Sequence, residues 1–310
     1  MARMWVTEGC NAFCHYCLNA RSREKHQMDT QHFTALCEYF KRNSFDKIAI
    51  MGGEPTIHPN FEEIMAISQK YFDTVYLFTN AINCSILNLY KPRENDTIIY
   101  NFSFANNLNK KSFLLDYPGK RHLDIVIGNE TKTEKLTENI LRVSSIDTAR
   151  IECNLVIDNC INIFKYKSLL IEKINEIYNN VRFQNPLVRI QFQSNLPLCF
   201  TYGEKLPPHA LNTICPNEAV LVDGEYNVRF CNLFSDKLVN MFKDDNLIPF
   251  KILRNYSRAA STGLRKKSLE KICKDCLIYG DQCNGKCYIP QDTIQREDIL
   301  NSTKLPWLTL

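Results

Sequence analysis

The chain has 310 residues, a length that suits one large domain with a smaller companion. Hydrophobic residues make up 45% of the chain and charged residues 23%, an ordinary globular balance that argues against disorder. The net charge of +4 is mild and does not favour a nucleic-acid partner. No stretch approaches the roughly 18 apolar residues of a membrane span, and no apolar signal segment precedes the first cysteine. We therefore expect a cytoplasmic protein with no membrane partner.

Short apolar runs alternate with helical patterns through about residue 195, as they do in parallel βα units. A first strand is predicted at residues 4–7, and the next helix can be capped by Asp29 or Thr30. Its apolar face is formed by Phe33, Leu36, Cys37 and Phe40, which predicts that Cys37 lies in the core. Later strands are predicted at residues 47–51, 74–79, 98–104, 123–127, 150–157 and 187–193, with helices such as 61–71 and 133–143 between them.

The number of βα units predicts the fold class. Successive crossovers are right-handed, so about six units curl into an incomplete barrel, short of the eight of a full one. After residue 195 the regular pattern fails, and four prolines occur in QSNLPLCFTYGEKLPPHALNTICPNE. We predict an α/β protein with a partial (β/α)6 TIM-like barrel at residues 1–198 and a smaller, loop-rich domain at residues 199–310.

A group of cysteines follows the first strand. The stretch EGCNAFCHYCL contains Cys10, Cys14 and Cys17, at the position where the loops of a βα barrel build active sites. Fourteen cysteines in a chain of this length without a signal segment indicate metal binding rather than disulfides. Three thiolates can hold an iron–sulfur cluster and leave one metal position for another ligand. Alternatively, a distant cysteine such as Cys84 or Cys153 completes an ordinary electron-transfer cluster.

A glycine pair ends the second predicted strand in KIAIMGGEPTIHP. Gly52 and Gly53 allow backbone to approach a ligand closely, and Glu54 can accept a hydrogen bond from an ammonium group. Alone, the motif would also fit a strand-to-helix turn with an exposed glutamate.

Together the two motifs resemble the radical S-adenosylmethionine superfamily. The resemblance lies in Cys10-x3-Cys14-x2-Cys17 with Tyr16, and in Gly52-Gly53-Glu54-Pro55, and it covers the first two-thirds of the chain. It implies that the three cysteines hold a [4Fe-4S] cluster whose open iron binds S-adenosylmethionine. The cofactor-binding residues that it implies are Tyr16, Gly52, Gly53, Glu54, Pro55, Asn80, Ser103 and Asn154. Thr79-Asn80 resembles the family's Thr-Asn-Gly, although Ala81 stands in place of the glycine.

The resemblance also implies a reaction. In that family a reduced cluster cleaves S-adenosylmethionine, and the 5′-deoxyadenosyl radical takes a hydrogen atom from the substrate. The cofactor supplies the chemistry while the protein orients the substrate and excludes solvent. The expected partner is a reductant such as flavodoxin or ferredoxin.

A second set of cysteines lies near the C-terminus. Its members are Cys215, Cys231, Cys273, Cys276, Cys283 and Cys287. The dense run after residue 272 indicates metal, with a zinc knuckle as the simplest alternative. Behind such a barrel the set resembles the SPASM/twitch auxiliary-cluster extension, with Gly224 permitting a hairpin before Cys231.

That pattern implies auxiliary [4Fe-4S] clusters, one on Cys215, Cys231 and Cys287 and a second on Cys273, Cys276 and Cys283. Each set is one ligand short. His209 or Cys199 can complete the first, an open iron there can face substrate, or a single cluster uses Cys215, Cys231, Cys273 and Cys276.

The expected function is oxidoreductase-type: oxidative modification or crosslinking of a ribosomally made peptide. Because the barrel begins at residue 3 or 4, leader recognition would then need a separate peptide-binding protein. The alternative is a dehydrogenase, epimerase or cyclase acting on a small metabolite (a sugar, aminocyclitol or nucleoside) in natural-product biosynthesis, because fold does not fix substrate. A non-catalytic multi-cluster electron carrier is a third hypothesis.

Overall fold

The structure is a computed structural model, and it describes residues 1–14, 17, 26–101, 118–144, 151–157, 165–192, 220–229, 237–243 and 246–253. The chain divides into a first unit, Met1–Leu123 with Asn217–Ser261, and a second unit, Asp124–Pro216 with Thr262–Leu310. The division falls inside strand β5 (Lys120–Ile127). The predicted boundary at residue 198 lies outside the described residues, so the division into residues 1–198 and 199–310 stays a prediction.

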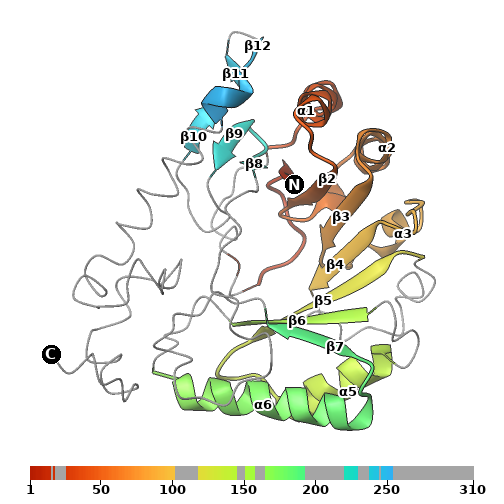
Figure 1. Cartoon of the computed structure of the whole chain (residues 1–310), viewed down its shortest axis with the longest axis vertical. Coiled ribbons are helices and arrows are strands. Elements are labelled where there is room, and N and C mark those ends of the chain that lie inside the picture. Colours follow the sequence, from red (N-terminus) through yellow and green to blue (C-terminus); the bar gives the residue numbers. More distant parts are fainter. Residues whose placement is uncertain are drawn as a thin grey trace, which may run out of the picture. The chain divides into compact units, whose positions relative to one another are not determined.

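Parallel strands form the centre of the sheet in the first unit, and Figure 1 shows β2, β3 and β4 beside one another. Each strand pairs in parallel with the next: β1 (Ala2–Thr7), β2 (Lys47–Gly52), β3 (Thr74–Thr79) and β4 (Thr97–Asn101). Between them lie α1 (Thr30–Arg42), η2 (Pro55–Ile57), α2 (Phe61–Tyr71) and the short α3 (Cys84–Leu87). The strands predicted at 4–7, 47–51 and 74–79 and the helix at 61–71 are confirmed. The strand predicted at 98–104 begins one residue earlier, at Thr97, and its residues after Asn101 lie outside the described part.

The core of the first unit lies between these strands and helices α1 and α2. One face of the sheet is formed by fully buried side chains that stand two residues apart in each strand: Met4, Val6, Ile48, Ile50, Val75 and Leu77. The residues between them in β1 and β2, Trp5, Ala49 and Met51, are also buried, so these two strands are buried on both faces. Helix α1 buries its predicted face, Phe33, Leu36, Cys37 and Phe40. Burial of each large apolar side chain among them contributes about 1.5–3 kcal/mol to the free energy of unfolding. Cys37 is fully buried, which confirms it as a core residue, and this burial raises the pKa of its thiol.

A later segment of the chain returns to the edge of this sheet. Strand β8 (Val220–Val222) pairs in parallel with β1, and β9 (Asn227–Arg229) pairs antiparallel with β8 and with β10 (Lys237–Asn240). The strand order in the unit is thus β10-β9-β8-β1-β2-β3-β4-β5. Two short strands, β11 (Phe242–Lys243) and β12 (Asn246–Leu247), pair with each other. The addition of β8 beside β1 was not predicted.

The hairpin predicted at Gly224 is confirmed, but glycine is needed there for a different reason. The left-handed residue of the turn is Tyr226, with φ of 66°. At Gly224 a Cβ atom would lie 3.2 Å from the carbonyl oxygen of His26. The glycine therefore allows the hairpin to approach the segment that precedes α1.

Asp29 joins this hairpin to α1. Its side chain accepts a hydrogen bond from the His32 amide at 2.8 Å, which makes it the N-cap of α1, as predicted. The Tyr226 hydroxyl donates to the same carboxylate at 2.5 Å, and the His32 ring also contacts it. Partial burial acts to raise the pKa of Asp29, but the hydrogen bonds from Tyr226 and His32 prevail and lower it to about 2.

The charge of Asp29 is expected to stabilise the fold in a pH-dependent way. Because the folded pKa is lowered from 3.8 to about 2, the contribution is present above the ordinary value and is lost as pH falls through about 2. Asp29→Ala should cost about 1 kcal/mol of unfolding free energy at pH 7. Asp29→Asn keeps a good cap, so its deficit reports the charge together with the hydrogen bond that the carboxylate accepts from Tyr226. Urea unfolding at stepped pH should show the Asn deficit vanish towards pH 2, and a pH-independent deficit would contradict this assignment.

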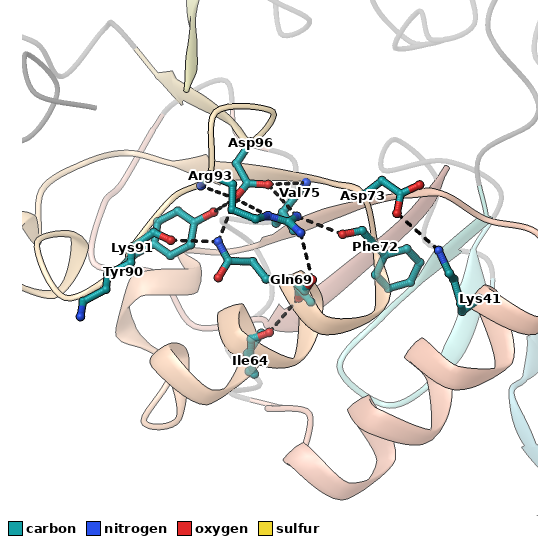
Figure 2. A network of polar contacts seen from close by, with 11 residues as sticks. Lys41, Ile64, Gln69, Phe72, Asp73, Val75, Tyr90, Lys91, Arg93 and Asp96 are labelled. Carbon is teal, nitrogen blue, oxygen red and sulfur yellow. Dashed lines mark hydrogen bonds and ion pairs between the residues drawn. The ribbon is translucent and has the colours of Figure 1, made fainter. Parts of the chain in front are cut away.

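Asp96 joins α2 to the beginnings of β3 and β4 (Figure 2). The residue is fully buried and accepts hydrogen bonds from the backbone amides of Val75, at 3.0 Å, and Arg93, at 2.9 Å. The Gln69 amide and the Tyr90 hydroxyl donate to it at 2.8 and 3.0 Å. The Arg93 guanidinium completes the network with an ion pair of 2.9 Å to Asp96. These donors hold the pKa of Asp96 below its usual value against the effect of burial, which acts to raise it.

The second unit repeats the βα pattern. It contains the end of β5, then α5 (Thr133–Ser144), β6 (Ile151–Ile157), α6 (Lys167–Gln184) and β7 (Arg189–Phe192), in the strand order β5-β6-β7. Strands β6 and β7 are parallel. The strands predicted at 123–127, 150–157 and 187–193 and the helix at 133–143 are confirmed with small shifts at their ends. None of the helices in the described part of the chain is long and apolar enough to cross a membrane.

Candidate functional site

Three loops meet where β1, β2 and β3 end. These strands are parallel neighbours, so their last residues, Thr7, Gly52 and Thr79, lie along the same edge of the sheet. The loop after β1 carries Cys10, Cys14 and Cys17, and the loop after β2 carries Glu54. Catalytic groups of βα barrels come from this edge.

Backbone hydrogen bonds hold the loop after β2 against the loop after β1. The amide of Gly53 donates to the Thr7 carbonyl at 2.8 Å, and the amide of Glu54 donates to the Gly9 carbonyl at 2.8 Å. The Thr7 hydroxyl accepts from the Gly9 amide at 3.1 Å. The cysteine loop therefore begins in a fixed geometry.

The glycine pair is required by this close approach. A Cβ atom at Gly53 would lie 2.1 Å from the Gly9 carbonyl oxygen. At Gly52, where φ is 153°, it would lie 2.2 Å from the Thr7 carbonyl oxygen. The glycine pair predicts a close approach of backbone to a ligand, and in the structure the close neighbour is the backbone that leads into the cysteine loop.

Glu54 is buried, unlike the exposed glutamate that a simple strand-to-helix turn would carry. Its side chain is 1% exposed. Oε1 accepts from the Thr56 amide at 3.1 Å, the Thr56 hydroxyl at 2.6 Å and the Thr79 hydroxyl at 2.7 Å, while Oε2 accepts from the Asn80 amide at 2.6 Å. Burial raises the pKa of Glu54, although these hydrogen bonds act to lower it. Pro55 follows as the first residue of η2, and Glu54 is the N-cap of that turn.

Asn80 connects the end of β3 to the cysteine loop. Its side-chain nitrogen donates to Oδ1 of Asn11 at 2.8 Å and lies 3.9 Å from Sγ of Cys10. Its side-chain oxygen accepts from the Ile82 amide at 3.0 Å. The next residue, Ala81, has φ of 52°, a left-handed conformation of the kind that glycine adopts most easily.

The three N-terminal cysteines share one loop but do not converge on a point. Cys10 is exposed, Cys14 and Cys17 are partly buried, and the Cys17 amide donates to the Cys14 carbonyl at 3.0 Å. Burial raises the pKa of the Cys10 thiol, against the hydrogen bond from the Ala12 backbone. Among the described residues, no three His, Cys, Asp or Glu side chains are gathered around a common metal position.

The donor set nevertheless fits an iron–sulfur cluster in its chemistry. Cysteine thiolates are the ligands of such clusters. Within the described residues, Cys10, Cys14 and Cys17 form no disulfide bond. They lie in the loop after β1, whose first residues are hydrogen-bonded to the loop after β2.

A buried ionic group supports the start of this loop. Arg229 of β9 lies 3.6 Å from the Glu8 carboxylate and 2.7 Å from that of Asp223. Its guanidinium also stacks over the Trp5 ring, 5.2 Å from the centroid. Burial, followed by the charge of Asp223, raises the pKa of Glu8. No local pattern in the sequence signals this group, because its members come from segments far apart in the chain.

Several predicted site residues cannot be placed. Tyr16, Ser103, Cys199, His209 and all of the C-terminal cysteines from Cys215 to Cys287 lie outside the described residues. Asn154 lies in the middle of β6, where its backbone pairs with that of Gln191. The roles assigned to these residues stay predictions.

The family model of the radical SAM superfamily matches residues 4–114. Residues 4–114 are thus similar to a radical SAM domain. The matched stretch includes both motifs of the site.

Two curated relatives match part of the chain. Molybdenum cofactor biosynthesis protein 1 from Homo sapiens is 32% identical over 91 residues, which cover 27% of this chain and 14% of that protein. GTP 3′,8-cyclase from Chlorobaculum tepidum is 32% identical over 83 residues, which cover 26% of this chain and 25% of that enzyme. The chain thus spans a quarter or less of these relatives. The matched lengths of 91 and 83 residues are somewhat shorter than the segment 4–114 that the family model matches.

Two solved structures share the fold. Native anSMEcpe with bound AdoMet and Cp18Cys peptide has a TM-score of 0.63 at 14% identity, over 97% of this chain and 93% of that one. SuiB from Streptococcus suis, bound to the precursor peptide SuiA, has a TM-score of 0.57 at 11% identity, over 79% of this chain and 62% of that one. These likenesses confirm the predicted fold class, an α/β protein with a partial TIM-like barrel.

Proposed function

We propose that the chain is a radical SAM enzyme that binds S-adenosylmethionine and a [4Fe-4S] cluster where β1, β2 and β3 end. Cys10, Cys14 and Cys17 would hold the cluster. The observation that carries the proposal is the hydrogen-bonded contact of Gly53 and Glu54 with the first residues of the cysteine loop, at 2.8 Å each. An isolated zinc or electron-transfer site has no need for a buried carboxylate at this position.

Glu54 is suited to receive the amino group of S-adenosylmethionine. A carboxylate offers about four acceptor sites, two on each oxygen. Oε1 takes three hydrogen bonds from Thr56 and Thr79, and Oε2 takes one from Asn80. Oε2 therefore keeps capacity for an ammonium donor, and the buried setting makes such a charge-assisted bond strong.

The chain's other residues would orient the cosubstrate. The Asn80 backbone amide donates to Oε2 of Glu54, and the Asn80 side chain donates to Asn11 of the cysteine loop. A ligand held by Oε2 would therefore lie beside the cysteine loop. When bound, the cluster supplies the electron that splits S-adenosylmethionine, the hard chemistry that cofactors carry. A reductant such as flavodoxin or ferredoxin would supply that electron in turn. The reducing cytoplasm suits a site made of thiols that form no disulfide.

The test is formation of 5′-deoxyadenosine. Protein reconstituted anaerobically with iron and sulfide, then given dithionite and S-adenosylmethionine, should produce 5′-deoxyadenosine detectable by mass spectrometry. Cys14→Ala should abolish the product. Cys37→Ala is the matched control, since Cys37 is buried in α1 away from the loop, and it should retain activity. Protein that binds only zinc and forms no 5′-deoxyadenosine would overturn the proposal.

For the substrate, we infer a peptide first and a small metabolite second. The peptide hypothesis is supported by two fold relatives whose structures hold peptides, SuiA in SuiB and Cp18Cys in anSMEcpe. The metabolite hypothesis is supported by the sequence match to GTP 3′,8-cyclase, an enzyme named for a nucleotide. Stimulation of 5′-deoxyadenosine formation by GTP, but not by peptides, would favour the second.

We also propose that residues 199–310 form a SPASM/twitch-type domain with one or two auxiliary [4Fe-4S] clusters. Support comes from the sequence alone, in the spacing of Cys215, Cys231, Cys273, Cys276, Cys283 and Cys287. Such clusters suit a net oxidation, because a substrate radical must lose an electron. Iron analysis separates the models, with about twelve irons for three clusters and about eight for two.

A further inference from the structure

We propose that Asn80 is a positioning residue that donates a hydrogen bond to the Cys10 sulfur and thereby raises the reduction potential of the cluster. This inference rests on the proposed function, since it concerns the same cysteine loop. It adds a role for Asn80, which belongs to neither the cysteine motif nor the Gly52-Gly53-Glu54-Pro55 motif.

The orientation of the Asn80 amide follows from its neighbours. Its oxygen accepts from the Ile82 amide at 3.0 Å, so its nitrogen must face the cysteine loop. The reverse orientation would place that oxygen against Oδ1 of Asn11 and the nitrogen against the Ile82 amide, pairing acceptor with acceptor and donor with donor. The network therefore permits only one orientation.

The two N–H groups of this amide have two acceptors. One donates to Oδ1 of Asn11 at 2.8 Å. The other has Sγ of Cys10 within reach, at 3.9 Å from the nitrogen. Iron binding requires the thiolate form of cysteine, and hydrogen bonds to ionised acceptors are about twice as strong as those to neutral ones. The contact with Cys10 is therefore strongest when the cluster is bound.

The backbone holds Asn80 in this position. Its amide donates to Oε2 of Glu54 at 2.6 Å, and the Thr79 hydroxyl donates to Oε1 at 2.7 Å while accepting from the Ala81 amide at 3.0 Å. Asn80 itself is 7% exposed. Glu54 thus fixes both the loop after β2 and the amide that faces Cys10, so the donor is preorganised.

A donor at this sulfur should favour the reduced cluster. Hydrogen bonds to the sulfurs are among the factors that set the potentials of iron–sulfur clusters. An N–H dipole aimed at a thiolate stabilises the state with more negative charge, which is the reduced state. The Asn80 amide should therefore make the cluster easier to reduce.

The test is the midpoint potential of the N-terminal cluster in reconstituted protein without S-adenosylmethionine. The cluster is recognised as the electron paramagnetic resonance signal that Cys14→Ala lacks. Asn80→Leu removes both N–H groups and keeps the branched shape of the side chain. It should lower the ratio of reduced to oxidised cluster at a fixed potential about fivefold, a shift of about 40 mV to more negative potential. Asn11→Ala leaves the Asn80 amide in place and should shift the potential by less than half as much.

Two outcomes would overturn the inference. A variant with full iron content and the wild-type potential would show that the Asn80 amide does not act on the cluster. If Asn80→Leu holds no cluster, Asn80→Ala replaces it with the same expectation. Loss of the cluster in both would assign Asn80 to cluster retention instead. Failure of the proposed function is distinct, because then the wild-type protein itself would form no cluster and no 5′-deoxyadenosine.

Discussion

Gly53→Ala is expected to lose most of its N-terminal cluster and to form 5′-deoxyadenosine at least tenfold more slowly than the wild type. The new Cβ atom would lie 2.1 Å from the Gly9 carbonyl oxygen and 2.6 Å from that of Glu8. Both atoms belong to the backbone that leads into Cys10, so no side chain can rotate away. The loop must move, and the hydrogen bonds that position it are lost. Overpacking of this kind typically costs 1–3 kcal/mol in stability as well.

Gly9→Ala is the matched control for that variant. It lies in the same loop, beside Cys10, but its Cβ would meet only side-chain atoms, Cδ1 of Ile57 at 3.2 Å and Oγ1 of Thr7 at 3.4 Å. A small adjustment of those side chains accommodates a methyl group. Iron content and 5′-deoxyadenosine rate measured side by side should therefore fall much further in Gly53→Ala. Equal behaviour of the two variants would show that the contact between the loops is not needed.

Asp96→Ala is expected to lower the free energy of unfolding by about 3 kcal/mol. Removing one partner of a buried ion pair leaves the remaining donors without an acceptor, which costs about 3–5 kcal/mol when both groups are fully buried. Asp96 is fully buried, but the Arg93 side chain is 38% exposed, so the lower end of that range applies. The amides of Val75 and Gln69 also lose their acceptor. Urea unfolding of the variant and the wild type measures the difference.

Asp73→Ala provides the comparison for Asp96→Ala. Asp73 is labelled in Figure 2 together with its partner Lys41. Its carboxylate pairs with Lys41 at 3.5 Å, but the side chain is 73% exposed. Exposed pairs contribute little, so the loss should stay below about 1 kcal/mol. Comparable losses in Asp96→Ala and Asp73→Ala would contradict the view that the buried network stabilises the first unit.

The regular part of the fold could be predicted because its signals are local. Strand alternation and the spacing of Phe33, Leu36, Cys37 and Phe40 are visible in short windows, and these elements are confirmed. The pairing of β8 with β1 could not be predicted in this way. Val220, Leu221 and Val222 are only three apolar residues, and their partner lies more than 200 residues earlier in the chain.

The candidate site could be predicted in part. Two adjacent glycines predict a close approach of backbone to another group, and the structure shows such an approach to the backbone before Cys10. The hydroxyl groups of Thr56 and Thr79, which hold Glu54, look in the sequence like ordinary turn and strand residues. Their role depends on the packing of the loop after β2 against the end of β3. The direction of the Asn80 amide likewise depends on contacts with Asn11 and Ile82 that no local pattern contains.

The most direct test of the central claim is whether S-adenosylmethionine binds at the N-terminal cluster. Electron paramagnetic resonance spectra of the dithionite-reduced, reconstituted protein should be recorded with and without S-adenosylmethionine. If Cys10, Cys14 and Cys17 leave an iron open beside Glu54, the signal that Cys14→Ala lacks should change its shape when the cosubstrate is added. An intact cluster whose signal stays the same at saturating S-adenosylmethionine would contradict the account.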